Sequence, residues 1–184
     1  MHNLDTDILS KEEYEMLQNF TNEHRKGEFM TARYLFWKLV DVQGWNSNSV
    51  TLKKEKHGKP FIESEEDRFF VSFSHSQDLV MCAISQDLDI GLDTETLNRE
   101  VNPEVVRRIL SEKEWKVYGE DDAISLWTMK EAAVKSLGTG LRTNLKELEL
   151  EKLESGHFSV TINQKKELRG ICFTALNHYI ALAY

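Results

Sequence analysis

The sequence has little of what marks stapled, fibrous or low-complexity proteins. Its 184 residues include two cysteines, two prolines and nine glycines, which excludes a collagen-like or low-complexity chain. Cys82 and Cys172 both lie within apolar, strand-like runs. We therefore expect two buried thiols rather than a disulfide, as suits a reducing cytoplasm.

Positive charge and long apolar runs are also scarce. Lysine and arginine number 23 against 31 acidic residues, for a net charge of −8, whereas general nucleic-acid binding needs net or strongly local positive charge. No apolar run approaches the ~20 residues of a membrane span, and the first residues lack the pattern of a signal peptide. We expect a cytoplasmic protein that binds neither nucleic acid nor membrane, and that holds any phosphate-bearing ligand in a local basic pocket.

What is present indicates a folded protein with a repeated organisation. Hydrophobic residues make up 40% of the chain and charged residues 29%, which excludes a disordered chain. The order of a helix followed by strands occurs twice, and a shift of 100 residues lays 71–84 over 171–184. Any two hairpins would match in part, so the match alone leaves an internal duplication open. Helical segments at 29–40 and 126–137 fall about 100 residues apart and support it.

Apolar spacing predicts helices over 11–42, 103–118 and 122–137, the last of them capped by Asp121 or Asp122 and ended by Gly138. Strands at 79–85 and 88–93 are expected to be joined by a short turn.

We predict an α+β fold of two similar lobes, related by a pseudo-twofold internal duplication. Each lobe would be a small antiparallel sheet packed with a long helix, over residues 1–87 and 88–184. The two lobes would form one structural unit, and a ligand would bind in the cleft between them.

A strand-like segment at 91–95 contains the first candidate site. Asp93 and Glu95 are two residues apart, so both carboxylates point to the same face of a strand. Two adjacent carboxylates repel each other unless a cation lies between them, and ligation by oxygen alone suits Mg²⁺. The alternative is a strand end with two solvated acids.

The clearest helix, at 122–137, contains the second candidate site. Trp127, Glu131 and Lys135 are spaced by four and share one face, with Lys130 about 100° away. The rest of the helix is apolar and should be buried, and a buried charged face needs a partner. Glu131 could complete a three-carboxylate Mg²⁺ site, while Lys130 and Lys135 could face phosphate oxygens. The alternative is an ordinary Glu–Lys surface pair.

Two turns carry further polar candidates. The hydroxyls and imidazole of Ser72-Phe73-Ser74-His75-Ser76 could bind phosphate, or the serines could satisfy only their own backbone. Gly58-Lys59-Pro60 fixes one lysine on a rigid turn, whereas we expect the lysines within 53–56 on a solvated face. The sequence has no zinc, P-loop, dinucleotide-binding or hydrolase-elbow motif.

In their order, these motifs resemble those of the 4'-phosphopantetheinyl transferase superfamily, of the surfactin-synthetase-activating type. The resemblance rests on residues 25–33, Gly58-Lys59-Pro60, Phe73-Ser74-His75-Ser76, 91–95 and W-x-x-K-E-A-x-x-K-x-x-G-x-G-L at 127–141. The segment 109–114 also resembles the F-S-x-x-E stretch of the family. The last motif is highly specific, whereas D-x-E alone is weak. The resemblance implies two similar α+β lobes in one chain.

The resemblance also implies a reaction. Such enzymes move phosphopantetheine from coenzyme A onto a serine of an acyl or peptidyl carrier protein, as in fatty acid biosynthesis, and release adenosine 3',5'-bisphosphate. By this resemblance the metal ligands are Asp93, Glu95 and Glu131, and the metal is Mg²⁺, for which Mn²⁺ could substitute. Glu131 is the candidate base, and Lys130 and Lys135 are the contacts of the diphosphate. Both sides of the cleft come from one chain, so a monomer suffices.

The same resemblance implies the residues that bind coenzyme A. They are Lys59, Ser74, His75 and Arg33, with Arg25 as a further contact, and His75 lies near the 3'-phosphate. Two other functions stay open: a module that binds coenzyme A without transferring any group, and an unrelated Mg²⁺-dependent phosphohydrolase that uses the same carboxylates.

Overall fold

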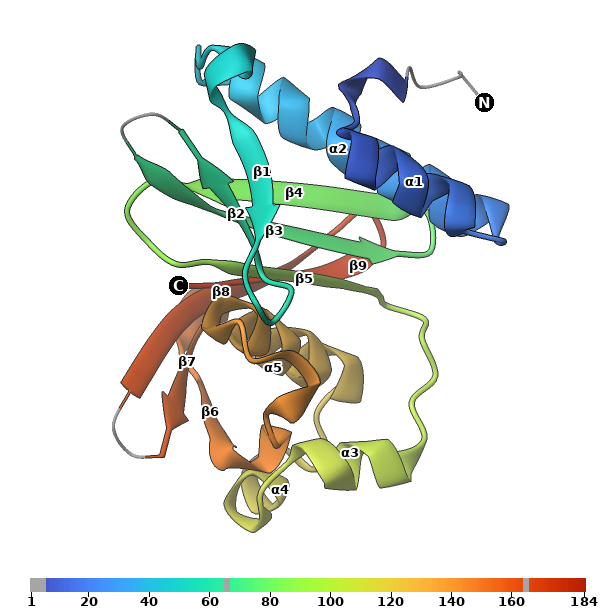
Figure 1. Ribbon diagram of the computed structural model, residues 1–184. Coiled ribbons are helices and arrows are strands. Elements are labelled where there is room, and N and C mark those ends of the chain that lie inside the picture. The colour runs from blue at the N-terminus through green and yellow to red at the C-terminus, as the bar shows by residue number, and fades with distance from the viewer. Residues whose placement is uncertain (1–5, 65–66, 164–165) are drawn as a thin grey trace.

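The computed structural model describes residues 6–64, 67–163 and 166–184 as two lobes, each with its own antiparallel sheet (Figure 1). The first lobe contains α1 (Lys11–Asn19), α2 (Glu23–Val42), β1 (Thr51–Lys54), β2 (Pro60–Glu63), β3 (Arg68–Ser76) and β4 (Leu79–Ser85). The second contains β5 (Gly91–Thr96), α3 (Pro103–Ile109), α4 (Glu112–Tyr118), α5 (Ala123–Leu137), β6 (Leu148–Lys152), β7 (His157–Ile162), β8 (Lys166–Ala175) and β9 (His178–Ala183). The α+β prediction with antiparallel sheets is confirmed.

The first lobe is a four-stranded sheet, in the order β1-β2-β3-β4, covered on one face by α2. Phe36 and Val40 of α2 are fully buried and pack against Ile62 of β2 and Val71 of β3. The predicted single helix over 11–42 is wrong. The chain breaks between α1 and α2 because the side chain of Asn22 accepts hydrogen bonds from the first amides of α2 and so starts a new helix.

The second lobe is a five-stranded sheet, in the order β5-β9-β8-β7-β6, packed against α5. Asp122 caps the first turn of α5, and Gly138 ends it in the left-handed conformation at φ 67°, as the sequence predicted. The predicted helix over 103–118 is two helices, because Ser111 and Glu114 form a capping box that starts α4.

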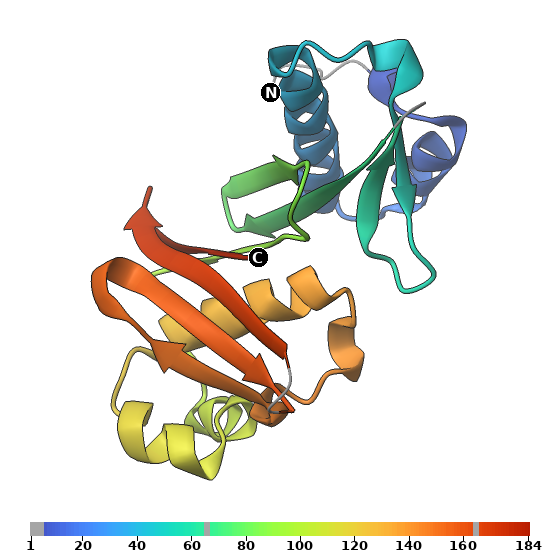
Figure 2. The ribbon, with the colours of Figure 1, turned by 90° about the vertical axis from the view of Figure 1, so that its left-hand side faces the viewer.

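The two lobes share a plan of one long helix followed by a four-stranded antiparallel meander (Figure 2). The hairpin turns of β3–β4 and β8–β9 both lie at positive φ, at Gln77 and at Leu176 and Asn177. These turns are 99 residues apart rather than 100. The second sheet has one strand more, because β5 pairs with β9 instead of forming a hairpin with β4.

The lobes meet where β5 runs beside β3, and side chains rather than a backbone ladder join the two strands. The Ser72 hydroxyl accepts a hydrogen bond from the Leu92 amide at 2.8 Å, and the Ser74 hydroxyl accepts one from the Thr94 amide at 3.1 Å. A second link is the 3.0 Å contact between His178 Nε2 and the Ser76 carbonyl oxygen. These contacts place the ends of β3 and β5 together.

Two further expectations concern the cysteines and the membrane. Cys82 and Cys172 are both free thiols, as expected, although each is half-buried rather than buried. Among the described residues, no helix has the length and apolar character needed to cross a bilayer.

Gly91 allows β5 to lie directly against α5. A Cβ atom at this position would overlap the Ala132 carbonyl oxygen and the Ser136 amide nitrogen, both of which are helix backbone. The glycine of the G-x-D-x-E motif is therefore a packing requirement, which fixes the distance between the strand and the helix that carry the candidate carboxylates.

We expect Gly91→Ala to destabilise the protein by about 3 kcal/mol or more, as an overpacked core does when backbone must move. Urea unfolding followed by circular dichroism would measure this. Gly27→Ala is the matched control, because Gly27 lies within α2 with nothing near its Cβ position, and it should be neutral or up to ~1 kcal/mol stabilising. Equal stability of the two variants would contradict the packing role.

Candidate active site

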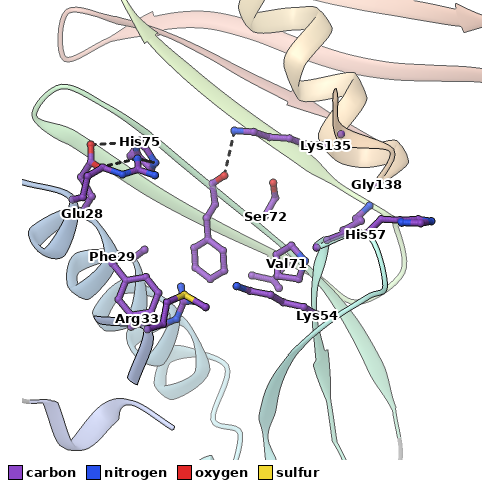
Figure 3. Close-up of a pocket in the computed structure, with 18 of the residues that line it drawn as sticks. Glu28, Phe29, Arg33, Lys54, His57, Val71, Ser72, His75, Lys135 and Gly138 are labelled. Atoms are coloured by element: carbon purple, nitrogen blue, oxygen red, sulfur yellow. Dashed lines mark hydrogen bonds and ion pairs between the residues drawn. The ribbon is translucent and has the colours of Figure 1, made fainter. Parts of the chain in front are cut away.

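A pocket of about 390 Å³ lies beside the junction of the two lobes (Figure 3). Residues from α1, α2, the β1–β2 turn, β3 and the end of α5 line it. Its apolar floor includes Phe29, Val71 and Phe73, and five lysine and arginine side chains surround that floor. Such a pocket suits a ligand with an apolar body and several negative charges.

Arg25, Glu28 and His75 form one cluster on the wall of this pocket. Arg25 Nη1 lies 2.8 Å from His75 Nε2 and 3.1 Å from Glu28 Oε2, while His75 Nδ1 lies 3.1 Å from Glu28 Oε1. Since the guanidinium can only donate, Nε2 accepts and the ring proton is on Nδ1, facing the carboxylate. Burial lowers the pKa of His75, and Glu28 opposes this shift. The cluster therefore holds a neutral imidazole beside a paired arginine.

Lys135, Asp93 and Ser74 form a second cluster, which spans the junction of the lobes. Lys135 Nζ lies 2.7 Å from Asp93 Oδ1 and 3.0 Å from Ser74 Oγ, and the Ser74 hydroxyl donates to Asp93 Oδ1 at 3.0 Å. Burial raises the pKa of Asp93, with Lys135 opposing the shift and Glu95 adding to it. Asp93 Oδ2 is buried and has no hydrogen-bond partner among the residues described.

Glu95 and Glu131 complete the acidic end of the site. Glu95 accepts a hydrogen bond from Ser76 Oγ at 2.9 Å and pairs with Arg99. Burial raises the pKa of Glu131, and Asp93 raises it further while Lys135 opposes the shift. Glu95 adds to the raised pKa of both Asp93 and Glu131, so the three predicted carboxylates lie within electrostatic range of one another.

The donor chemistry of this acidic end fits a hard divalent cation. All three side chains offer oxygen, and one buried carboxylate oxygen of Asp93 lacks a partner. Within the described ranges, no three acidic, histidine or cysteine side chains are grouped as for an assembled metal site. The cation would therefore have to draw these side chains together, and the ammonium of Lys135 is the charged partner of Asp93 in this structure.

Lys59 and Arg33 line the pocket with their charges already paired. Lys59 is nearly buried and donates to Asp89 and to the carbonyl oxygen of Ser136, so the turn of the first lobe is attached to the end of α5. Arg33 pairs with Glu13, and its guanidinium lies 4.3 Å from the centre of the Phe29 ring.

Lys130 does not reach the pocket, and the expected contact with a diphosphate has no geometric basis. Its side chain is fully buried, and Nζ donates to the Ile109 carbonyl at 2.7 Å, to Glu114 at 2.8 Å and to the Leu145 carbonyl at 2.9 Å. Adjacent residues of an α-helix are rotated by about 100°, so the side chain of Lys130 points away from Glu131 and into the second lobe. It instead holds α5 to the end of α3 and to the segment before β6.

The buried pair of Lys130 and Glu114 explains the role of the segment 109–114, which resembles the F-S-x-x-E stretch of the family. Glu114 accepts from the Ser111 amide at 2.7 Å and from the Leu150 amide at 2.7 Å, besides pairing with Lys130. One carboxylate therefore caps α4, ties it to β6 and neutralises the lysine.

Sequence reasoning missed several residues of the pocket. Met16 and Phe20 of the first helical hairpin, Glu28 and Lys54 all contribute to its lining. The signal for Lys54 was available, because it alternates with the apolar Leu52 and so faces the same side of β1. The carboxylates of Glu13 and Asp89 gave no such signal, since their partners Arg33 and Lys59 are distant in sequence.

The fold and the site define a two-lobed α+β protein whose junction joins an acidic cluster to a basic pocket. Residues 89–183, just over half of the chain, match the family model of the 4'-phosphopantetheinyl transferase superfamily. The chain therefore belongs to the 4'-phosphopantetheinyl transferase superfamily, as the sequence motifs predicted.

Similar proteins include two bacterial enzymes and one human enzyme. The chain is 27% identical over 163 residues to the 4'-phosphopantetheinyl transferase Sfp of Bacillus subtilis (strain 168), which covers 84% of this chain and 71% of that protein. It is 24% identical over 147 residues to the 4'-phosphopantetheinyl transferase gsp of Aneurinibacillus migulanus, covering 76% and 58%. It is 26% identical over 164 residues to the human L-aminoadipate-semialdehyde dehydrogenase-phosphopantetheinyl transferase, covering 78% and 52%. The match thus spans between about half and 71% of these relatives.

We expect Lys130→Met to lower the free energy of unfolding by about 3–5 kcal/mol, because it leaves the Glu114 carboxylate buried without its counter-charge. Chemical denaturation would measure this, and adding Glu114→Gln should recover part of the loss. Lys113→Met is the control, since Lys113 forms an exposed pair with Glu149 at 3.4 Å and should change stability by less than about 0.5 kcal/mol. If Lys130→Met left the stability unchanged and weakened only coenzyme A binding, the structural role would be contradicted and a ligand contact would be favoured.

Proposed function

We propose that this protein transfers the 4'-phosphopantetheine group from coenzyme A to a serine of an acyl or peptidyl carrier protein. The other product would be adenosine 3',5'-bisphosphate, and the reaction would require Mg²⁺. The observation that carries the proposal is the contact of Lys135 with Asp93 and Ser74 at the junction, between the acidic cluster and the basic pocket. Membership of the superfamily supports it.

The basic pocket would hold coenzyme A, with its diphosphate at the junction. Arg25 and His75 would meet the 3'-phosphate from one wall, with Arg33 and Lys59 along the pocket. Lys135 keeps about a third of its side chain exposed, so it can donate to a diphosphate oxygen beside Asp93. Ser74 would hold this lysine in place.

Asp93, Glu95 and Glu131 would hold the metal, which we propose to be Mg²⁺ with Mn²⁺ as a substitute. When bound, the cation would neutralise charge on the diphosphate and make its phosphorus easier to attack. The orphaned oxygen of Asp93 and the raised pKa values of Asp93 and Glu131, to which burial and their acidic neighbours contribute, are the features that favour cation binding here.

Glu131 is the proposed base. A serine hydroxyl is a weak nucleophile at neutral pH, so its proton must be removed as it attacks. A carboxylate whose pKa is raised by burial is a better proton acceptor than an exposed one. The serine oxygen forms its bond to phosphorus as the diphosphate P–O bond breaks, and Lys135 stabilises the charge on the departing bisphosphate.

We also propose the setting in which this reaction occurs. Both walls of the pocket come from one chain, so a monomer is sufficient. Two free cysteines agree with a reducing cytoplasm. The carrier would be of the fatty-acid, polyketide or peptide kind, all of which present a serine.

Intact mass spectrometry of carrier proteins tests the reaction. A fatty-acid carrier and a peptidyl carrier, each incubated with the protein, coenzyme A and Mg²⁺, should gain about 340 Da, the mass of phosphopantetheine, and a chelator should abolish the gain. Release of phosphate or nucleotide without any carrier would indicate a phosphohydrolase instead. Coenzyme A binding with no gain on either carrier would favour a binding module.

We expect Glu131→Gln to lower turnover by about 10²–10⁴-fold with little change in stability, because it removes a base and a metal ligand but almost no volume. Initial rates of carrier modification and a melting curve would measure both quantities. Glu120→Gln, an exposed position, is the matched control. Turnover of the Glu131 variant within threefold of the wild type would rule out its assignment as base.

We expect His75→Ala to raise KM for coenzyme A about tenfold while kcat changes by less than threefold. The reason is that His75 orients Arg25 toward the pocket and does not touch the reacting bond. Steady-state kinetics with coenzyme A as the varied substrate would measure this, and His157→Ala on β7 is the control. A loss confined to kcat would contradict the assignment.

A further inference from the structure

His178 lies where the equivalent hairpin turns of the two lobes meet. It is the first residue of β9, and only 2% of its surface is exposed. Its Nδ1 lies 2.7 Å from the Leu176 carbonyl oxygen in the β8–β9 turn, and its Nε2 lies 3.0 Å from the Ser76 carbonyl oxygen at the end of β3. One buried side chain therefore contacts the backbone of both hairpins.

The two partners of the His178 ring set the positions of its protons. A carbonyl oxygen can only accept a hydrogen bond, so each of the two contacts requires a proton on the ring nitrogen. A ring that carries both protons is positively charged, and the carboxylate of Asp78, in the β3–β4 turn, lies 3.8 Å from Nε2. The contact with the first lobe therefore depends on the proton of Nε2.

Ser76 links His178 to the acidic end of the site. The Ser76 hydroxyl donates a hydrogen bond to Glu95 Oε2 at 2.9 Å, while its carbonyl oxygen faces His178. Farther back along β3, Ser72 and Ser74 are bonded to amides of β5. Ser76 is the last residue of β3, and its own link to β5 goes to a side chain instead. The end of the strand is thus fixed to the second lobe through His178 and Glu95.

The pairing of β5 with β9 closes this set of contacts into a ring. Thr96 lies opposite His178 in the ladder, and Glu95 lies opposite Tyr179. The backbones that carry His178 and Glu95 are therefore fixed relative to each other within the second sheet. The side chains of both reach across to Ser76, which holds a strand end of the first lobe between them.

We propose that His178 is a positioning residue for Glu95: it holds the end of β3 so that the Ser76 hydroxyl keeps the Glu95 carboxylate oriented for the metal. This inference rests on the proposed function, in which Glu95 is a metal ligand. His178 lies outside the pocket lining, so its loss should change metal affinity rather than coenzyme A binding. Loss of a residue that orients a metal ligand typically weakens metal binding 10–100-fold.

Two substitutions separate the bond to Ser76 from the bond to Leu176. The amide nitrogen of glutamine is as many bonds from Cα as Nε2 of histidine, and that of asparagine as many as Nδ1. His178→Gln can therefore keep the bond to Ser76, whereas His178→Asn can keep only the bond to Leu176. Each variant loses one bond, so their midpoints of urea unfolding should fall by similar amounts.

Metal binding should distinguish these two variants. We expect His178→Asn to weaken Mn²⁺ binding about tenfold and His178→Gln to weaken it less than threefold, as followed by electron paramagnetic resonance of the free ion. In carrier modification, His178→Asn should raise the Mg²⁺ concentration needed for half-maximal rate about tenfold and leave KM for coenzyme A within twofold. A merely loosened fold would change both constants. Equal Mn²⁺ affinity of the two variants would overturn the proposal.

A double-mutant cycle tests the route through Ser76. Ser76→Ala removes the hydroxyl that holds Glu95, so it should weaken Mn²⁺ binding about as much as His178→Asn. The double variant should bind Mn²⁺ no more weakly than either single variant, because both changes break the same link. Losses that multiply in the double variant would show that His178 acts by another route and overturn the proposal.

Nitrogen NMR of the wild type tests the contact without any substitution, and so remains decisive if a variant does not fold. We expect a proton on Nε2 of His178. An Nε2 without a proton would overturn the proposal, because the Ser76 carbonyl would then have no donor on the ring.

The wild-type measurements keep this inference distinct from the proposed function. Wild type that binds Mn²⁺, with the expected loss in His178→Asn, but that modifies no carrier would support His178 while refuting the transfer. Wild type that modifies carriers while His178→Asn binds Mn²⁺ equally well would refute His178 alone. Failure of the wild type to bind Mn²⁺ would refute both the metal ligands and the role of His178.

Discussion

The hydrogen bonds from β5 amides to the serine hydroxyls of β3 are the constraint on which the rest of the site depends. Ser72 and Ser74 act in place of a backbone ladder, so two separate sheets meet along one line without merging. Asp93 lies between the two bonded amides of β5, and its side chain accepts a hydrogen bond from Ser74 of the first lobe. Ser74, which joins the two lobes, also contacts Lys135. The contact that assembles the fold therefore also assembles the site.

The helix that carries Glu131 and Lys135 is held from two sides. Gly91 brings β5 against its backbone, and the buried pair of Lys130 and Glu114 attaches its other face to α4. These contacts involve no ligand, yet they set the position of both proposed reacting groups to within the tolerance of close packing. The motif on α5 therefore contains residues of two kinds. Lys130 supports the helix, whereas Glu131 and Lys135 are the proposed reacting groups.

The architecture was within reach of the sequence because it depends on local patterns. Alternation gave the strands, and Asp122 and Gly138 gave the bounds of α5. The breaks at residues 20–22 and 110–111 were missed because the flanking segments are both helical, and only a capping side chain separates them. The pairing of β5 with β9 was missed because strand order depends on contacts about 85 residues apart, as between Thr94 and the Tyr179 carbonyl.

The sequence predicted which types of residue form the site, but it did not predict which residues each of them contacts. Spacing placed Asp93 with Glu95 on one strand face and Glu131 with Lys135 on one helix face, because strand and helix periods fix their faces. That the two elements lie together was an implication of the family resemblance, and the contact of Lys135 with Asp93 agrees with it. Spacing could not distinguish Lys130 from Lys135, since each is a lysine on an apolar helix and only the packing of α3 and α4 shows which is buried.

The paired cations of the pocket have a consequence for selectivity. Glu13, Glu28, Asp89 and Asp93 each pair with a lysine or arginine that lines the pocket, so the protein's own carboxylates would compete with any incoming anion. A small anion such as inorganic phosphate could displace one carboxylate and would gain little, because it exchanges one ion pair for another. A ligand with three linked phosphates can exchange several pairs in a single binding event, at a high effective concentration for each step after the first. In the proposed function, the internal pairs would act as an energetic threshold against simple anions, without any steric barrier.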